Sequence, residues 1–157
     1  MNDNEKNIRN DFIQRLIDKH GINRTALLPV LQDFQNEFGF IDEHSIQMIA
    51  FALDIHPVEV SSVISFYSFL YDKPMGRNVV RICKNIVCEF HGSNEIANTI
   101  KEEFKINAGE TTEDGKLTFE LISCFGLCDR SPSMMVNGNV YENMNRESAL
   151  KILRNLR

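Results

Sequence analysis

The sequence predicts an α/β protein in which a bundle of about four helices precedes a small domain that contains a β-sheet. Apolar residues recur at helical spacing up to about residue 72, and a cluster of turn-forming residues follows at Asp72–Gly76. Short strand-type runs and a hairpin signal occur only after that cluster. We therefore expect a helical N-terminal domain over residues 1–76 and a second domain over residues 77–157.

Each of the four expected helices combines an apolar stripe with a signal at one of its ends. The stripes are, in chain order, Ile8, Phe12 and Leu16 with Ile13 and Ile17 beside them; Leu27, Leu31, Phe34 and Phe38; Ile46, Ile49, Ala50 and Leu53; and Val60, Val63, Ile64, Tyr67 and Leu70. The end signals are Gly21 after the first helix, Thr25 before and Gly39 after the second, Asp42 before the third, and Pro57 at the start of the fourth.

The second half of the chain follows the order strand, helix, strand, β-hairpin, helix. The strand-type runs are Val79–Ile82 and Leu117–Ile122, and the helices are marked by Ile96–Phe104 and Ala149–Leu156. Asn137-Gly138, flanked by short apolar runs, is the signature of a type I′ hairpin turn. This order predicts a small α/β sandwich of the thioredoxin-like type.

Composition and charge exclude several classes of function. The chain has 157 residues, of which 43% are hydrophobic and 25% are charged, as in an ordinary globular protein. Its net charge is −5, and no Lys or Arg lies between Thr25 and Asp72, so we expect no nucleic-acid partner. The longest uncharged stretch, 60–71, is too short to cross a membrane, so we expect no direct membrane insertion.

The N-terminal residues are polar and contain no apolar segment of a secretory signal, so we expect a cytoplasmic protein. Thiols stay reduced in the cytoplasm, which makes structural disulfides improbable for the four cysteines. Metal binding or redox chemistry is the better explanation for them.

All four cysteines lie in the second half, as a C-x4-C pair followed by a C-x3-C pair with 35 residues between them. The pairs are Cys83 with Cys88, and Cys124 with Cys128. Each pair follows a predicted strand, so two loops at one end of the sheet can bring the four thiols together. Thiolates are soft ligands that suit zinc or an iron–sulfur cluster, and the wide spacing within each pair favours the cluster.

Other residues near the cysteines have a role in either interpretation. Gly92 and Gly126 could let backbone N–H groups approach cluster sulfurs. His91 could complete a Cys3His zinc site or act as a Rieske-like ligand, but a solvated loop histidine is the simpler interpretation because four cysteines already complete a ligand set. The chain contains neither a G-x-G-x-x-G motif nor a phosphate-binding loop, so we expect no site for NAD or nucleotide phosphates in this chain.

Two cysteine-containing segments make a resemblance specific. C-K-N-I-V-C-E-F-H-G (Cys83–Gly92) and C-F-G-L-C-D-R-S-P (Cys124–Pro132) resemble the thioredoxin-like [2Fe–2S] ferredoxin family. This family is the small flavin-partnered subunit of respiratory complex I and of related NAD-linked formate dehydrogenases and hydrogenases. The helical lead-in of the family is similar to Leu27–Ile41 and Ser65–Phe69. The resemblance therefore covers nearly the whole chain.

By this resemblance Cys83, Cys88, Cys124 and Cys128 are the ligands of a [2Fe–2S] cluster. It implies one-electron transfer by a subunit of an NAD(P)(H)-linked oxidoreductase that is not active alone. Its partners would be a flavin- and NAD-binding subunit and further iron–sulfur subunits, and its place would be the cytoplasm or the peripheral arm of a membrane-attached complex. Two departures, Lys84 beside a ligand and Arg130-Ser131 before the proline, could shift the reduction potential or the docking.

Two alternatives remain at this point. A structural zinc site in an interaction module would use the same four cysteines. A thioredoxin-like dithiol enzyme is disfavoured because the chain has no C-x-x-C motif.

The helical region also carries a hypothesis about docking. The segment Thr25–Asp72 has seven acids and no Lys or Arg, and on its last helix Phe66 and Phe69 point away from the predicted apolar stripe. Interface cores are rich in aromatic residues and poor in charge, so residues 1–72 could hold the chain against a partner subunit. Alternatively, every apolar side chain packs inside the chain.

Overall fold

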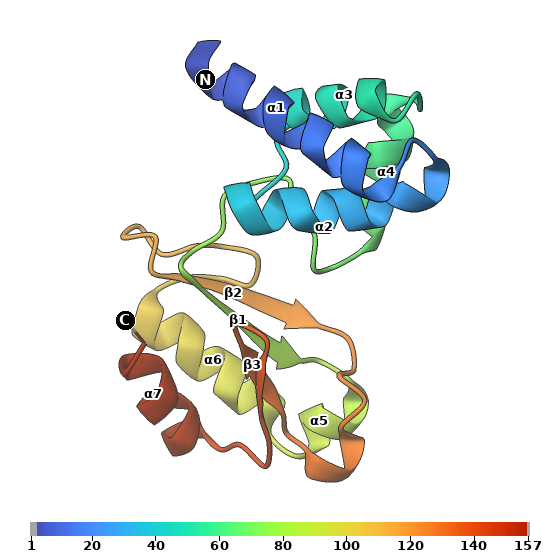
Figure 1. Cartoon of the computed structure of the whole chain (residues 1–157). Helices are drawn as coiled ribbons and strands as arrows, with labels where there is room; N and C mark the ends of the chain where they lie inside the picture. Colours follow the sequence, from blue (N-terminus) through green and yellow to red (C-terminus); the bar gives the residue numbers. More distant parts are fainter. Residues whose placement is uncertain (1–2, 157) are drawn as a thin grey trace. The chain divides into compact units, whose positions relative to one another are not determined.

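The computed structural model describes residues 3–156, which form two compact units (Figure 1). One unit ends at Pro74 and the other begins at Met75, within the turn-forming segment Asp72–Gly76. An α/β fold with a helical N-terminal region is confirmed, since the first unit is helical and the second contains a four-stranded sheet.

The first unit consists of helices that pack around an apolar core. Its elements are α1 (Asp3–His20), the 3-10 helix η1 (Arg24–Ala26), α2 (Leu27–Phe38), α3 (Glu43–Ala52) and α4 (Pro57–Phe66). Contacts join α1 to both α2 and α3, and α4 to both α2 and α3. The core is made by the apolar faces that the sequence predicts, and in α1 it contains Ile13, Leu16 and Ile17, while Ile8 is half exposed.

Most of the predicted helix ends are confirmed, with one exception. The Asp42 carboxylate accepts a hydrogen bond of 2.9 Å from the Ser45 amide at the start of α3, and Pro57 is the first residue of α4. The residue that caps the second helical segment is Asn23 instead of Thr25. The Asn23 side chain accepts a hydrogen bond of 3.1 Å from the Ala26 amide and another from the Thr25 hydroxyl, because the chain first forms the short helix η1.

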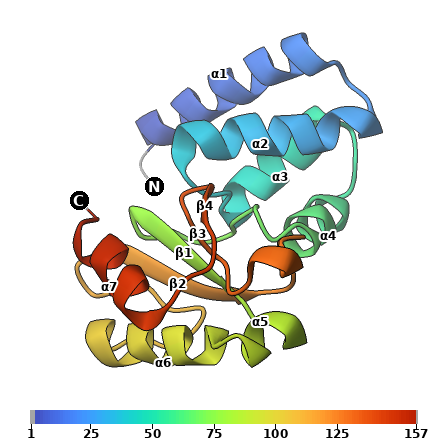
Figure 2. The same cartoon turned by 90° about the horizontal axis from the view of Figure 1, so that it is seen from below.

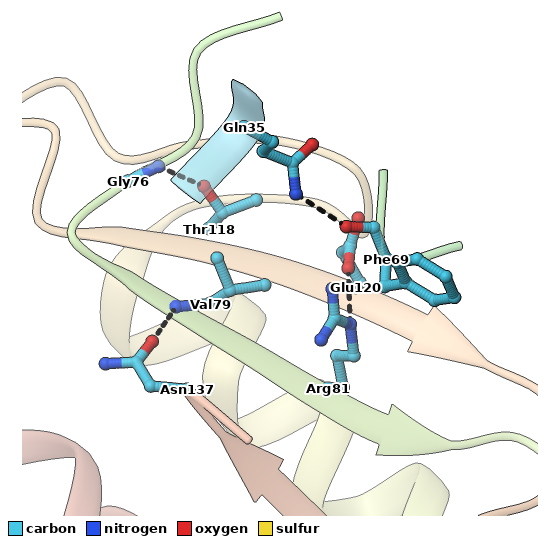
Figure 3. Close-up of polar contacts among 8 residues, drawn as sticks. All are labelled: Gln35, Phe69, Gly76, Val79, Arg81, Thr118, Glu120 and Asn137. Atoms are coloured by element: carbon cyan, nitrogen blue, oxygen red, sulfur yellow. Dashed lines mark hydrogen bonds and ion pairs between the residues drawn. The ribbon is translucent and has the colours of Figure 1, made fainter. Parts of the chain in front are cut away.

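The fourth helix is shorter than predicted, because it ends at Phe66 and its last predicted apolar positions lie in an extended segment. The Gln35 side chain in α2 holds this segment (Figure 3). Its amide nitrogen donates to the Phe69 carbonyl oxygen at 2.7 Å, and its amide oxygen accepts from the Tyr71 N–H at 2.6 Å. In a longer helix the Phe69 carbonyl oxygen and the Tyr71 N–H would form hydrogen bonds within the helix. Here the Gln35 side chain provides those bonds instead.

A polar network joins α1 to the start of α3. The Arg9 guanidinium donates to the Asp42 carboxylate at 2.9 Å and to the buried Ser45 hydroxyl at 2.8 Å. Burial by itself would raise the pKa of Asp42, but the hydrogen bonds from Ser45 and Arg9 outweigh it and hold this pKa below its ordinary value. Asp42 is therefore both the cap of one helix and the partner of another.

The second unit is built on a sheet with the strand order β2-β1-β3-β4. Its elements are β1 (Asn78–Cys83), α5 (Ile86–Phe90), α6 (Ser93–Phe104), β2 (Leu117–Ile122), the 3-10 helix η2 (Cys128–Arg130), β3 (Met134–Val136), β4 (Asn139–Tyr141) and α7 (Arg146–Arg154). Strands β1 and β2 run parallel, whereas β3 pairs antiparallel with both β1 and β4. Helices α6 and α7 pack together and cover one face of the sheet, where the core of this unit lies (Figures 1 and 2).

Side chains outside the core fix the register of the sheet (Figure 3). Arg81 on β1 and Glu120 on β2 lie in register and form an ion pair of 2.8 Å. The predicted hairpin is confirmed, and the Asn137 side chain at its turn accepts a hydrogen bond of 2.8 Å from the Val79 N–H.

Gly76 lies so close to β2 that a Cβ atom would come within 2.8 Å of the Leu117 backbone, so only glycine fits there.

Within residues 3–156 no single helix is both long and apolar enough to cross a membrane. Helices α3 and α4 meet those criteria only as a pair, and they are bent by 119° at the break between them.

Candidate functional site

The cysteines lie where the two parallel strands of the sheet end. Cys83 is the last residue of β1 and pairs in register with Ile122, the last residue of β2. Parallel strands present their carboxyl ends at the same edge of a sheet, so the segments after β1 and β2 emerge together. Figure 1 shows α5 and the segment that follows β2 at this end of the sheet.

The first pair is buried. Cys83 and Cys88 are each 1% exposed. Cys88 lies in the short helix α5, whose start is capped by the Asn85 side chain. Burial raises the pKa of the Cys83 thiol, the nearby Cys88 thiol raises it further, and backbone N–H groups of Asn85 and Phe125 act in the opposite direction.

The second pair is exposed, with Cys124 in the loop after β2 and Cys128 at the start of η2. The Sγ atoms of Cys124 and Cys128 are 3.2 Å apart, and the Gly126 N–H donates to Cys124 Sγ at 3.2 Å. The hydrogen bond from the Cys128 thiol, followed by the one from the Gly126 amide, lowers the pKa of Cys124. The same Cys124–Cys128 contact raises the pKa of Cys128.

The two pairs come together at one site. The Cys83 side chain interacts with those of Cys88 and Cys124, and Cys128 lies close enough to Cys83 and Cys88 to interact electrostatically with both. The structure thus gathers all four cysteines that the sequence singles out. Over the described range, residues 3–156, no three His, Cys, Asp or Glu side chains converge as a group on the position of a single metal ion.

Two other residues singled out by the sequence, Gly92 and His91, form hydrogen bonds at the end of α5 and none to a cysteine sulfur. The Gly92 N–H donates to the Glu89 carbonyl oxygen at 3.0 Å, so it continues the end of α5 and does not approach a cysteine. His91 is exposed, and its Nδ1 lies 2.7 Å from the Val87 carbonyl oxygen, which is a helix-end contact. Gly126, by contrast, brings its N–H to a sulfur as predicted.

Sequence reasoning missed the apolar surface beside the cysteines. Ile86 and Phe90 lie four residues apart on α5, on the opposite side from the buried Cys88, and Phe90 is 84% exposed. The signal was the pair of apolar residues that flanks Cys88 at helical spacing. A loop was expected there because the segment between the cysteines is too short for periodicity to reveal a helix.

A comparison with protein families now decides between the interpretations of the site. The model of the thioredoxin-like [2Fe-2S] ferredoxin family matches residues 13–157. The chain belongs to this family. The cofactor of this ferredoxin is therefore a [2Fe–2S] cluster, and the zinc alternative is set aside. The site is compatible with that group, because it offers four soft thiol ligands in two pairs at one edge of the sheet.

Named relatives cover most of this ferredoxin. It is 32% identical over 141 residues to an NADH-quinone oxidoreductase subunit of Buchnera aphidicola subsp. Baizongia pistaciae, with 90% of this chain and 82% of that protein covered. It is also 32% identical over 130 residues to the same NADH-quinone oxidoreductase subunit from Escherichia coli strain K12, with 83% and 78% covered.

A solved structure shares its fold. An NAD+-reducing [NiFe]-hydrogenase in the air-oxidized state superposes with a TM-score of 0.69 at 21% identity, over 80% of this chain. This ferredoxin spans 22% of the length of that hydrogenase chain.

Proposed function

We propose that this ferredoxin is the [2Fe–2S] electron-transfer subunit of a multi-subunit NADH-linked oxidoreductase and that it exchanges single electrons with a flavin-bearing partner subunit. The observation that carries the proposal is the meeting of four thiols at one sheet edge, two of them open to solvent. The relatives that are named as NADH-quinone oxidoreductase subunits indicate the kind of complex.

Cys83, Cys88, Cys124 and Cys128 are the proposed ligands. When bound, the cluster supplies reversible one-electron oxidation and reduction. The chain contributes a buried pair held by β1 and α5, and an exposed pair through which electrons can enter and leave. Backbone N–H groups, such as that of Gly126 beside Cys124, stabilise negative charge on the sulfurs.

The proposed partner is a subunit that carries the flavin and NAD sites, and the proposed place is the peripheral arm of the complex. We assign the docking role to residues 1–72, within an N-terminal domain of residues 1–76, and cluster binding to a separate domain of residues 77–157. Phe66 is 78% exposed and Phe69 is 40% exposed, at the end of α4 and in the segment held by Gln35. Ring contacts join Tyr67 to both phenylalanines, so the aromatic surface is preformed.

The partner assignment is tested by isolation of the tagged full chain from its host. A flavoprotein should co-purify, and addition of NADH to this complex should reduce the cluster, as detected by EPR. The isolated chain should not oxidise NADH with any dye acceptor. Rapid NADH oxidation by the rigorously pure chain, or reduction of its cluster by NADH without the flavoprotein, would contradict the division of labour.

The docking surface is tested by Phe66→Ser. Because the side chain is mostly exposed, we expect stability to change by less than about 0.5 kcal/mol while the yield of co-purified flavoprotein falls strongly. Phe51→Ser is the matched control, since Phe51 is an exposed phenylalanine on a different helix, α3. If both variants retain the partner equally well, the aromatic surface of α4 does not dock.

A further inference from the structure

The exposed cysteine pair has a chemistry of its own that does not require a bound cluster. We infer that Cys124 and Cys128 form a thiol–disulfide modification site in the cluster-free chain, with a small disulfide such as oxidised glutathione as co-substrate. The product is a reversible intramolecular Cys124–Cys128 disulfide, and Cys83 and Cys88 stay reduced.

The geometry of the pair favours this reaction. The two Sγ atoms are 3.2 Å apart, so they have to approach by only about 1.2 Å to reach the ~2.0 Å length of a disulfide bond. The loop between them turns at Gly126, whose φ is +83°, and apart from Gly126 and its two chain neighbours no heavy atom lies within 4 Å of the position that a Cβ atom would take there. The side of the turn at Gly126 is therefore open.

Accessibility separates this pair from the other one. Cys124 and Cys128 are both exposed, and a tripeptide disulfide can reach either sulfur. Cys83, at the end of β1, and Cys88, in α5, are each only 1% exposed. Thiol–disulfide exchange needs access of the attacking sulfur to the disulfide bond, so the buried pair has to wait for local unfolding.

The exchange takes place in two balanced steps. One thiolate of the pair attacks a sulfur of oxidised glutathione, a protein–glutathione disulfide forms, and the first glutathione thiolate leaves. The second thiolate of the pair then attacks the protein sulfur of that mixed disulfide, and the second glutathione thiolate leaves. The two cysteines lose two electrons and two protons in total, which end on two molecules of reduced glutathione.

The disulfide has a consequence that rests on the proposed function. Because both sulfurs are proposed cluster ligands, the oxidised chain cannot accept a cluster until a thiol reductant has opened the bond. The disulfide also shields the two exposed sulfurs from irreversible oxidation to sulfinic and sulfonic acids. The exposed pair would thus make cluster insertion dependent on the thiol redox state of the cell.

Peptide mapping tests the site directly, because trypsin separates the cysteines. Cleavage after Lys and Arg places Cys83 in peptide 82–84, Cys88 in 85–101, and both Cys124 and Cys128 in 117–130. The full-length cluster-free chain is treated anaerobically with oxidised glutathione, and the remaining thiols are alkylated before digestion. We expect peptide 117–130 to lose two hydrogens at least about tenfold faster than either other peptide is modified.

Variants sharpen this result. Cys128→Ser should stop at a glutathione adduct on Cys124, whereas Phe51→Ser, at an exposed position of the other unit, should form the same disulfide as the wild type at the same rate. Disulfides that join Cys83 or Cys88 to another cysteine at a comparable rate would overturn the inference. So would a peptide 117–130 that stays fully reduced.

A second measurement distinguishes the inference from the ligand assignment. Iron and sulfide are added to the oxidised chain with and without prior reduction by a phosphine, and the visible spectrum is recorded. Both proposals predict a cluster only after reduction. If the disulfide forms but the cluster still assembles without reduction, the modification site stands and the ligand set is wrong. If no disulfide forms while the reduced chain takes up a cluster, the ligand set stands and the modification site is wrong.

Discussion

The two cysteine pairs reach the same edge of the sheet, but their surroundings differ. Cys83 and Cys88 are buried in a strand end and a helix, whereas Cys124 and Cys128 are exposed, the first in a loop and the second at the start of the 3-10 helix η2. The buried pair has its position fixed by the core of the domain. The exposed pair is held by local hydrogen bonds and is open to electrons and reagents. The buried pair therefore gives the site a fixed position, and the exposed pair gives electrons and small reagents access to it.

Serine substitution of each cysteine should give the largest effect and should separate the two pairs. We expect all four variants to lose the [2Fe–2S] spectrum or to show a strongly altered one, because a hydroxyl is a poor replacement for a soft thiolate. Only Cys83→Ser and Cys88→Ser should also destabilise the cluster-free chain, by about 1–3 kcal/mol, because they place a hydroxyl in a buried position. The cluster is followed by visible absorption and EPR, and stability is measured by urea unfolding.

The exposed variants, Cys124→Ser and Cys128→Ser, are the controls for stability. Wild-type spectra in all four variants would show that the ligand set is wrong. Equal destabilisation by all four would remove the difference between the pairs.

A smaller effect is expected in the helical unit, which contains no cysteine. Asp42→Ala removes both the helix cap and the partner of Arg9, and should cost about 2 kcal/mol at neutral pH. Asp42→Asn retains a capping oxygen but loses the charge, and should cost about 1 kcal/mol. Hydrogen exchange of the α1 and α3 amides measures both, and the cluster spectrum should stay unchanged.

The difference between the wild type and Asp42→Asn should depend on pH. The pKa of Asp42 is lowered in the folded chain, so its charge contributes stability above the ordinary carboxyl pKa near 4. That contribution is lost as the pH falls through the lowered pKa of the folded state. An equal difference at pH 7 and at pH 2 would show that the Arg9–Asp42 ion pair contributes nothing.

The smallest effect tests the local hydrogen bond of the exposed pair. Gly126 and Gly138 both have φ = +83° and open space at the Cβ position, so Gly126→Ala and Gly138→Ala should each cost about 1 kcal/mol. Only Gly126→Ala should change the reduction potential and the EPR spectrum, because relief of the strained φ there displaces an N–H that donates to Cys124 Sγ, whereas no such bond is formed at Gly138. Identical spectra and potentials in both variants would show that this hydrogen bond does not tune the site.

The sequence predicts those features that depend on neighbouring residues. The Asn137-Gly138 turn, the start of α4 at Pro57 and the cap at Asp42 follow from local chemistry, and all three are confirmed. The sequence also predicts that the two cysteine pairs follow strands at one end of the sheet, and the parallel pairing of β1 with β2 places Cys83 and Ile122 together at that edge.

Features that depend on distant or very short segments escape such reasoning. The fourth helix stops early because Gln35, more than thirty residues away, binds the segment that follows it. Helix α5 has only five residues, so no periodicity reveals it. The burial of one cysteine pair and the exposure of the other depend on how α5 and the η2 loop pack, which spacing alone does not encode.

The central claim is that this chain holds one [2Fe–2S] cluster on Cys83, Cys88, Cys124 and Cys128. The most direct test is the content of iron, acid-labile sulfide and zinc in the full chain, produced with ample iron and purified anaerobically. The account predicts two iron atoms and two sulfides per chain for a single [2Fe–2S] cluster, with little zinc, and loss of both iron and sulfide when Cys83 and Cys124 are replaced together. Stoichiometric zinc without sulfide, or full iron and sulfide in that double variant, would contradict it.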